Sequence, residues 1–430
     1  MAIETNRFLL PSGKREAKSY GQYANMYFSR MKQLNFDFAL AKCKDLVPDA
    51  PACWVAGSVY KTQALKPNVL NELIAHAIAD HRPNVGDVEK HTSADDSYAL
   101  EDETGRVTIR SSDLVTSYGL VTGVIVALFG TLDQEGFFNV RDIGYPQMTR
   151  PQPALTPSME DNWIALTSGL NGGAPDSISL GLHIFFQFIS GKLAGLAGAE
   201  DLKISQLILA GCSLIPPKRL AFKNENRRFG TDYAPIDTEP LKNVDTMLSS
   251  VLNDVRIDMM PGATDPANIS FPQQPVNRSL FANAGLYDSL HTVTNPYIFS
   301  LADGTTLLGT SGQNIDDIYQ NSSIDSRLDI AERTLTWSHI APTCPDTLWG
   351  YPFTGHDPFV LEDRPHVYFI GNQPAFEQRL VVDETTGAKT LVLLIPSFEK
   401  TGVFVLLNTR TMEVRPSSLD TSDLDAAMNE

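Results

Sequence analysis

Residues 365–374 read PHVYFIGNQP, a run of strand-forming residues followed by a glycine turn. The β-branched and aromatic residues at 367–370 predict a buried β-strand that ends at Gly371. Beyond the glycine stand an amide, Asn372, and Pro374, which has no side-chain donor atom. A strand and turn of this kind can carry metal ligands in an enzyme. Because no strong metal ligand follows the strand here, the segment indicates a structural scaffold rather than a catalyst.

Three further apolar segments, 163–167, 204–210 and 255–260, predict strands that also end at glycine turns. Helices are predicted after the first two of them, from 176 or 177 to 189 and from 241 to 252, and more strands at 391–395 and 403–407. Alternating strands and helices are typical of an α/β sheet, which normally presents its site at the carboxyl ends of the strands.

The N-terminal 150 residues follow a different pattern. In segment 1–35, tyrosines and a methionine recur at helical spacing (Tyr20, Tyr23, Tyr27 and Met31), and we expect a helix that docks on its own domain. Residues 36–150 predict an OB-type Greek-key barrel, because short strands joined by Gly and Asp turns surround one helical stretch at 67–79. The predicted strands are 54–60, 98–100, 107–109, 120–129 and 137–143.

Proline-rich residues 145–157 are expected to link the barrel to the α/β domain, which we place at 151–415. The tail at 416–430 contains Ser, Asp and Glu without a core pattern, and we expect it to be disordered. The 430-residue length agrees with two domains plus terminal extensions, since one ordinary core would not hold so long a chain.

Charge and cysteine usage limit the class of protein. The net charge of −17 argues against extended contact with DNA phosphates, and the small basic excess in residues 1–35 is typical of a solvated helix face. The four cysteines form no CxxC pair, so we expect reduced thiols in a cytosolic or nuclear protein without a signal peptide. The longest apolar run, 118–132, is shorter than the ~20 residues of a membrane span.

In metal-dependent phosphoesterases, the four strands that correspond to the predicted ones end in Asp-x-His, Gly-Asp-x-x-Asp, Gly-Asn-His-Asp/Glu and Gly-His-x-His. A hard divalent ion needs several such oxygen or nitrogen ligands converging on it. Asp265 is the one carboxylate here, so we expect no metal, no cofactor and no catalytic residue. The positions that stand in place of ligands are Ser168, Gly169, Leu170, Cys212, Pro261, Gly262, Asp265, Asn372 and Pro374.

Other catalytic templates are also absent from the sequence, which has no G-x-S-x-G elbow, P-loop, G-x-G-x-x-G or H-E-x-x-H. Cys212 has no adjacent His or basic residue and is expected to be a small buried filler. His356-Asp357, in a Gly/Pro-rich loop, predicts a turn with a local side-chain hydrogen bond rather than part of a catalytic triad.

Several ordered motifs resemble the small (B) subunits of eukaryotic DNA polymerase delta, from about residue 19 to about residue 418. They are IDMMPGATDPAN at 257–268, FPQQP at 271–275, LGTSGQN at 308–314, PDTL at 345–348, YPF at 351–353, DPF at 357–359 and the segment 365–374. In the barrel region, GSVYK at 57–61 and LEDE at 100–103 match in kind. The sister families of polymerases alpha and epsilon share the architecture, and the motif detail favours delta.

This resemblance implies an OB domain followed by a calcineurin-like phosphoesterase αββα sandwich whose metal site has decayed. It implies a non-catalytic subunit of a nuclear hetero-oligomer for DNA replication and repair. Such a subunit bridges the C-terminal region of the catalytic subunit to a third accessory subunit, with little or no direct DNA binding and no membrane. The motifs are mainly loop-shaping Gly and Pro positions, so they assign no partner interface.

Two other functions stay open at this stage. One is an active metallophosphoesterase, a nuclease or phosphatase, that recruits ligands from elsewhere, for example Asp265, His339 and His356. The other is a free OB protein that binds single-stranded nucleic acid through aromatic and basic side chains.

Overall fold

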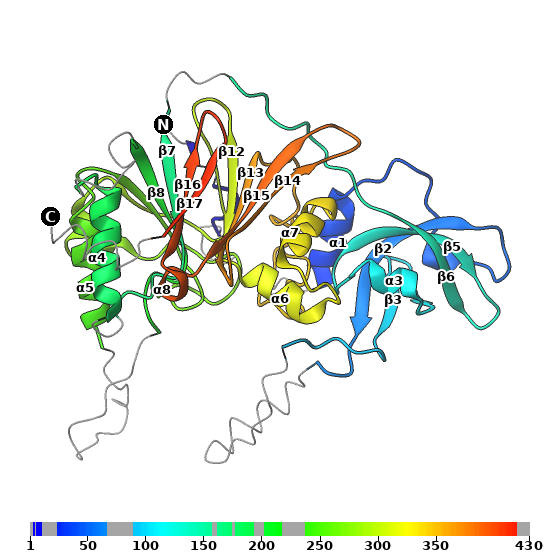
Figure 1. The fold of residues 1–430 in the computed structure, drawn as a ribbon. Helices are drawn as coiled ribbons and strands as arrows, with labels where there is room; N and C mark the ends of the chain where they lie inside the picture. Colours follow the sequence, from blue (N-terminus) through cyan, green and yellow to red (C-terminus); the bar gives the residue numbers. More distant parts are fainter. Residues whose placement is uncertain are drawn as a thin grey trace, which may run out of the picture.

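Two structural units follow one another along the chain, a closed β-barrel and a pair of stacked six-stranded sheets (Figure 1). The structure is a computed structural model, and it describes residues 3–4, 6–10, 24–66, 89–156, 161–173, 177–192, 202–216 and 237–418. The helix predicted at 67–79 and residues Tyr20 and Tyr23 lie outside these ranges. In the part of the chain that is described, no helix has the length and apolar character needed to span a bilayer.

The barrel has the strand order β2-β3-β4-β6-β5 and closes because β2 pairs with both β3 and β5. Its elements are β2 (Cys53–Thr62), β3 (Ser97–Glu101), β4 (Arg106–Ile109), α3 (Asp113–Ser117), β5 (Ile125–Leu132) and β6 (Phe137–Gly144). The strand predicted at 120–129 begins only at Ile125. The preceding residues are buried but turn, because Gly119 and Gly123 have φ values of 62° and 90° that an extended strand does not use.

The first sheet has the order β1-β11-β12-β13-β15-β14, and the second has the order β10-β9-β8-β7-β16-β17. The strands of the first are β1 (Ile3–Glu4), β11 (Tyr297–Ser300), β12 (Thr306–Thr310), β13 (Val367–Gln373), β15 (Lys389–Pro396) and β14 (Glu377–Val382). The strands of the second are β10 (Leu290–Thr292), β9 (Arg256–Met260), β8 (Ile204–Ala210), β7 (Trp163–Thr167), β16 (Val403–Asn408) and β17 (Val414–Ser418).

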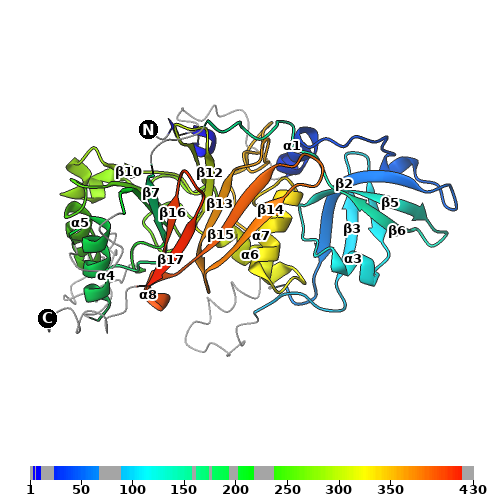
Figure 2. The same cartoon turned by 45° about the horizontal axis from the view of Figure 1, so that its top comes forward.

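Helices cover the outer face of each sheet, so the layers run helix, sheet, sheet, helix (Figures 1 and 2). Neighbouring residues of β7 and of β8 point to opposite faces of the second sheet, which explains this order. Ile164 and Ile208 lie in the core between the sheets, whereas Ala165 and Leu207 pack with the helices of the second sheet. The helices are α4 (Ser177–Ile189) and α5 (Glu239–Ser249) on the second sheet, α6 (Gln313–Asn321) and α7 (Arg327–Thr336) on the first, and the short α8 (Phe398–Thr401).

Both ends of the described chain differ from expectation. Residues 416–418 were expected to begin a disordered tail but belong to β17, which pairs antiparallel with β16. Val414 packs against the core between the sheets, and this contact was hidden by the polar residues that surround it. Near the N-terminus, Ile3–Glu4 adds an edge strand to β11, so segment 1–35 is not helical throughout.

The barrel and the sheet pair share one hydrophobic core rather than being joined only by a linker. Barrel residues such as Leu100 and Phe138 belong to the same buried cluster as Ile315 of α6 and Tyr368 of β13. The predicted linker is itself fixed, because Arg150 N donates to Glu362 O at 2.8 Å and Gln152 Nε2 donates to Lys389 O at 2.7 Å. The two units therefore form one body.

A buried charge cluster of Arg30, His339 and Asp357 lies where the units meet. Arg30 comes from α1 (Ala24–Gln33), which Figures 1 and 2 place between the barrel and α7. Arg30 Nε donates to Asp357 Oδ2 at 2.8 Å, and His339 Nε2 lies 3.0 Å from the same oxygen. Arg30 also donates to the carbonyl oxygens of Gly123, at 2.7 Å in the barrel, and of Pro342 and Cys344, each at 2.8 Å.

The turn predicted at His356-Asp357 is correct in its local part, because Asp357 Oδ1 accepts from Phe359 N at 2.9 Å. The sequence did not predict the pairing of Asp357 with Arg30. Neither side chain of this pair has any exposed surface. Burial opposes ionisation of Asp357, but the charge of Arg30 and the hydrogen bonds from His339 and Phe359 N hold the pKa of this carboxyl well below its usual range.

We predict that Arg30→Met destabilises the chain by about 3–5 kcal/mol, because it leaves a buried carboxylate without its main counter-charge. Urea unfolding of the purified chain measures this loss. The matched control is Arg410→Met, which removes a surface pair with Asp161 at 2.7 Å, and it should change stability only slightly. Equally small losses in both variants would contradict a central role for the cluster.

His339 makes the stability of the chain depend on pH. Burial and the nearby Arg30 charge lower the pKa of His339 to about 4. An unfolded histidine titrates near about 6.5, so between these values the unfolded chain binds more protons and stability falls as the pH is lowered. We expect wild type to lose on the order of 3 kcal/mol more than His339→Gln between pH 6.5 and 4.

The measurement is the free energy of unfolding at several pH values for both chains. His183→Gln, at an exposed position on α4, is the control and should follow wild type. Parallel curves for wild type and His339→Gln would refute the assignment.

Candidate functional site

The carboxyl ends of parallel strands from the two sheets meet at one edge of the sheet pair. Strands β7, β8 and β9 are parallel in the second sheet, and β12, β13 and β15 are parallel in the first. The turns that follow them and the last residues of β13, which we call the strand-end cluster, comprise residues 168–169, 211–214, 261–265, 311–313 and 371–373. This is the place where an α/β sheet presents ligand-binding side chains.

Glycine backbones fill the space between these turns. A methyl group built on Gly211 would overlap Ser311 Cβ and lie 3.0 Å from Gly262 Cα. A methyl group on Gly262 would overlap Cys212 N, and one on Gly371 would overlap Ala210 O. The turns of the two sheets therefore touch through their main chains, and not even a methyl group fits between them.

Neutral hydrogen bonds hold this contact. Gly169 N donates to Gly211 O at 2.9 Å, and Asn372 N donates to Ser168 Oγ at 2.8 Å. The Asn372 amide nitrogen crosses between the sheets, donating to Ser311 O at 2.8 Å and to Ala210 O at 3.2 Å. Asn372 has a φ of 57°, a left-handed conformation that asparagine tolerates better than most residues. Its side chain is thus a bridge between turns.

Asp265, the one carboxylate among the predicted positions, accepts hydrogen bonds from backbone N–H groups of two neighbouring turns. Its Oδ2 accepts from Gly262 N at 2.8 Å and Ser213 N at 3.3 Å, and its Oδ1 accepts from Leu214 N at 3.0 Å. Burial raises the pKa of Asp265 to about 6, against the lowering effect of these backbone hydrogen bonds. The carboxyl group ties the turn after β8 to the turn after β9.

A buried amide network next to these turns was missed in the sequence. Asn295 Nδ2 donates to Gln273 Oε1 at 2.9 Å, Ser311 Oγ at 2.8 Å and Gln313 Oε1 at 2.9 Å. Gln273 Nε2 in turn donates to Gly262 O at 3.1 Å. None of these residues except Ser311 directly follows a strand, and amides carry no periodic signal. Gln273 lies in the FPQQP motif, which was the one available hint.

The remaining predicted positions divide between the cluster and its surroundings. Cys212 lies in the cluster, where burial raises the pKa of its thiol, so it is not activated as a nucleophile. Pro261 is buried directly after β9. Leu170 packs into the core beneath α4 and α5, and Pro374 is exposed, so neither takes part in the cluster.

The side chains of Asp265, His339 and His356 are not brought together. His339 belongs to the buried charge cluster, where its Nδ1 also accepts from Ala341 N at 3.2 Å, while His356 Nδ1 lies 2.9 Å from Gln33 Nε2 at the surface. Within the described ranges, no three His, Cys, Asp or Glu side chains gather as a possible metal-ligand set. These three residues therefore do not form the alternative metal site considered from the sequence.

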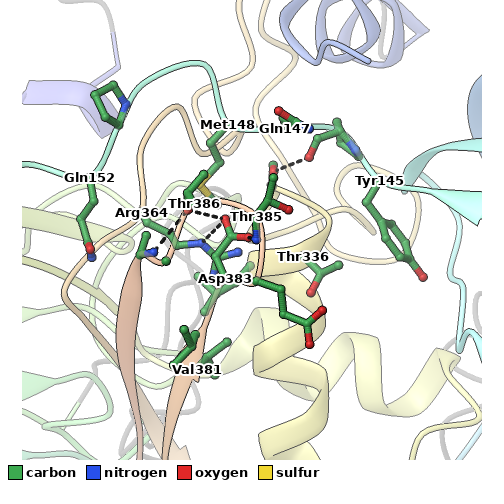
Figure 3. A pocket seen from close by; sticks show the side chains of 18 of the residues that line it. Tyr145, Gln147, Met148, Gln152, Thr336, Arg364, Val381, Asp383, Thr385 and Thr386 are labelled. Carbon is green, nitrogen blue, oxygen red and sulfur yellow. Dashed lines mark hydrogen bonds and ion pairs between the residues drawn. The ribbon is translucent and has the colours of Figure 1, made fainter. Parts of the chain in front are cut away.

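A large cavity lies elsewhere, between the linker, α7 and the β14–β15 hairpin (Figure 3), and has a volume of about 780 Å³. Asp383 is held in the hairpin turn, accepting from Thr385 N at 3.0 Å and Thr386 Oγ1 at 2.9 Å, with Arg364 Nε at 3.5 Å. The Ser338 hydroxyl donates to Pro146 O at 3.1 Å. Asp383 and Ser338 thus help to hold the walls of the cavity in place.

Known proteins match most of the length of this chain. The family described as DNA polymerase delta subunit OB-fold domain matches residues 22–143, and the family of DNA polymerase alpha/epsilon B subunits matches residues 164–378. The DNA polymerase delta small subunit of Arabidopsis thaliana is 38% identical over 421 residues, covering 93% of this chain and 91% of that protein. The chain belongs to the DNA polymerase delta small subunit family.

Relatives in other organisms have the same name. The DNA polymerase delta small subunit of Oryza sativa subsp. japonica is 37% identical, covering 93% of this chain and 94% of that protein. That of Saccharomyces cerevisiae is 34% identical, covering 97% and 93%. The OB-type barrel is thereby confirmed, and so is the resemblance to polymerase delta small subunits. A solved archaeal phosphodiesterase covers 60% of this chain and 99% of its own, with 11% identity and a TM-score of 0.30, which is too low to support an argument.

We predict that Gly262→Ala lowers the stability of this polymerase delta small subunit, with a loss of about 1–3 kcal/mol, because the added methyl group must push the turns of the strand-end cluster apart. Gly181→Ala on α4 is the matched control: its methyl group meets nothing within 4 Å, and it should stabilise the helix by about 0.5–1 kcal/mol. Thermal and urea unfolding measure both. A neutral Gly262→Ala would mean that the cluster is looser than its contacts indicate.

Proposed function

We propose that this chain is a non-catalytic accessory subunit of DNA polymerase delta, and that its second unit is a calcineurin-like phosphoesterase sandwich without a working metal site. The observation that carries the absence of catalysis is the strand-end cluster, in which the backbone of Gly371 in one sheet touches that of Ala210 in the other. A hydrolase of this architecture would need open space and charged ligands at the same position.

The side chains present do not fit a pair of divalent metals. Such ions take several carboxylate or imidazole ligands at about 2.0–2.6 Å. Here the polar groups are mainly neutral amides and hydroxyls, and the Asp265 carboxylate is occupied by backbone N–H groups. A nucleophilic role for Cys212 is also unsupported, because this residue is half-buried and burial raises the pKa of its thiol.

The partners follow from family membership rather than from geometry. We propose that the chain bridges the C-terminal region of the catalytic subunit to a third accessory subunit in a nuclear hetero-oligomer for DNA replication and repair. Its shared core suits this role, because the barrel and the sheet pair would hold two partners at a fixed separation.

Charges on the barrel favour this role over free single-strand binding. Arg106 is paired with Glu101 at 2.7 Å, and Arg110 with Asp133 and Glu135, each at 2.7 Å. Aromatic rings lie beneath both guanidinium groups, at 4.4 Å for Tyr60 and 4.8 Å for Phe137. Such rings can stack on bases, but the cations beside them are neutralised, and the net charge of −17 repels phosphates.

The test is reconstitution. Co-expressed with the catalytic and third subunits of DNA polymerase delta, the chain should co-elute with both in size-exclusion chromatography. By itself it should show no Mn²⁺-dependent hydrolysis of a phosphodiester substrate such as bis(p-nitrophenyl) phosphate. Co-elution fails if the bridging role is wrong. Stoichiometric metal together with turnover would instead restore the phosphoesterase hypothesis.

A further inference from the structure

A groove of about 330 Å³ lies between α1 and the barrel. Figures 1 and 2 show α1 beside β2 at this junction. The apolar lining of the groove comes from two elements. They are α1, with Tyr27, Phe28 and Met31, and β2, with Val59 and Tyr60. Phe28 and Tyr60 are 42% and 40% exposed, which is unusual for large aromatic side chains on two neighbouring elements.

Both walls of the groove are held in place. Arg30, two residues after Phe28, fixes α1 through its buried bonds to the barrel and to Asp357. On the barrel side, Arg106 lies 4.4 Å from the Tyr60 ring centre and is paired with Glu101 at 2.7 Å. A partner would therefore meet a preformed groove and would lose little binding energy to ordering it.

The charges that line the groove are mainly acidic. Its lining contains three carboxylates, Glu101, Asp102 and Asp346, against one cation, Arg106. Asp346 is also paired with Lys66 at 2.7 Å, and Arg106 is neutralised by Glu101. Three carboxylates thus stand against two cations, Arg106 and Lys66, and this net negative charge complements a basic protein segment rather than a nucleic acid.

We propose that this groove is a docking site for a segment of a partner subunit that inserts one large apolar side chain flanked by lysine or arginine. The proposal rests on the assignment of the chain as an accessory subunit and goes beyond it by naming the surface and the chemistry of the segment. The exposed rings of Phe28 and Tyr60 would contact the inserted side chain, and Glu101 and Asp346 would pair with its basic neighbours. A buried apolar anchor with a polar rim is the usual form of a binding hot spot.

The experiment uses the full chain and measures its affinity for the purified catalytic subunit and for the purified third subunit of polymerase delta separately. The double variant Phe28→Ala/Tyr60→Ala should weaken binding to one of them about tenfold or more. The control is Leu286→Ala/Leu380→Ala, which truncates two side chains that are 81% and 56% exposed outside the groove. It should bind like wild type, and circular dichroism checks that both variants are folded.

A second variant tests the charge of the partner segment. Glu101→Gln/Asp346→Asn keeps the apolar lining, so it should weaken the same interaction and make its salt dependence shallower. Unchanged affinity of the aromatic double variant for both subunits would overturn the proposal. So would a selective loss of oligonucleotide binding, or the conversion of a dimer of this chain to a monomer. If wild type binds neither subunit, the accessory-subunit assignment itself fails, and the docking site fails with it.

Discussion

The relative placement of the two units depends on the buried guanidinium of Arg30. A charge with no exposed surface must have all its donors satisfied, and its partners come from the barrel, the 342–344 loop and Asp357. Such a group adds little net stability compared with apolar packing, but it is satisfied in only one arrangement of these segments. The shared hydrophobic core supplies the stability, whereas Arg30 selects the orientation in which the barrel meets the sheets.

The strand-end cluster, unlike the Arg30 cluster, is held mainly by neutral hydrogen bonds. Strand ends with their ligands removed, and nothing in their place, would leave buried polar backbone without partners. Here Asn372 and Asn295 provide amide donors to carbonyl and hydroxyl groups, and glycines allow the turns to approach until their backbones touch. The edge of the sheets that would carry chemistry in an enzyme becomes a packed joint between the two sheets.

Sequence reasoning succeeded where burial leaves a pattern along the chain. Segment 204–210 is predicted as a strand from the apolar run at 207–210, and this run arises because both faces of the strand are buried there. The pairing of Arg30 with Asp357 left no such trace, since the two residues are 327 positions apart and a single arginine on a helix resembles a solvated charge. The same holds for Gln273 and Asn295, whose amides meet only after folding. Glycine turns could be located from the sequence, but their mutual contact could not.

Most of the polar bonds described above lie within the fold and hold it together, whereas the exposed apolar side chains remain available for partners. Charge pairs such as Arg110 with Asp133 and Glu135 are satisfied within the barrel, and the Asn372 amide nitrogen is satisfied by carbonyl oxygens of both sheets. Little directional polar chemistry is then left for a ligand, and the net charge of −17 disfavours association with DNA. A subunit built in this way would recognise its partners mainly through shape and exposed apolar side chains on a body that does not deform.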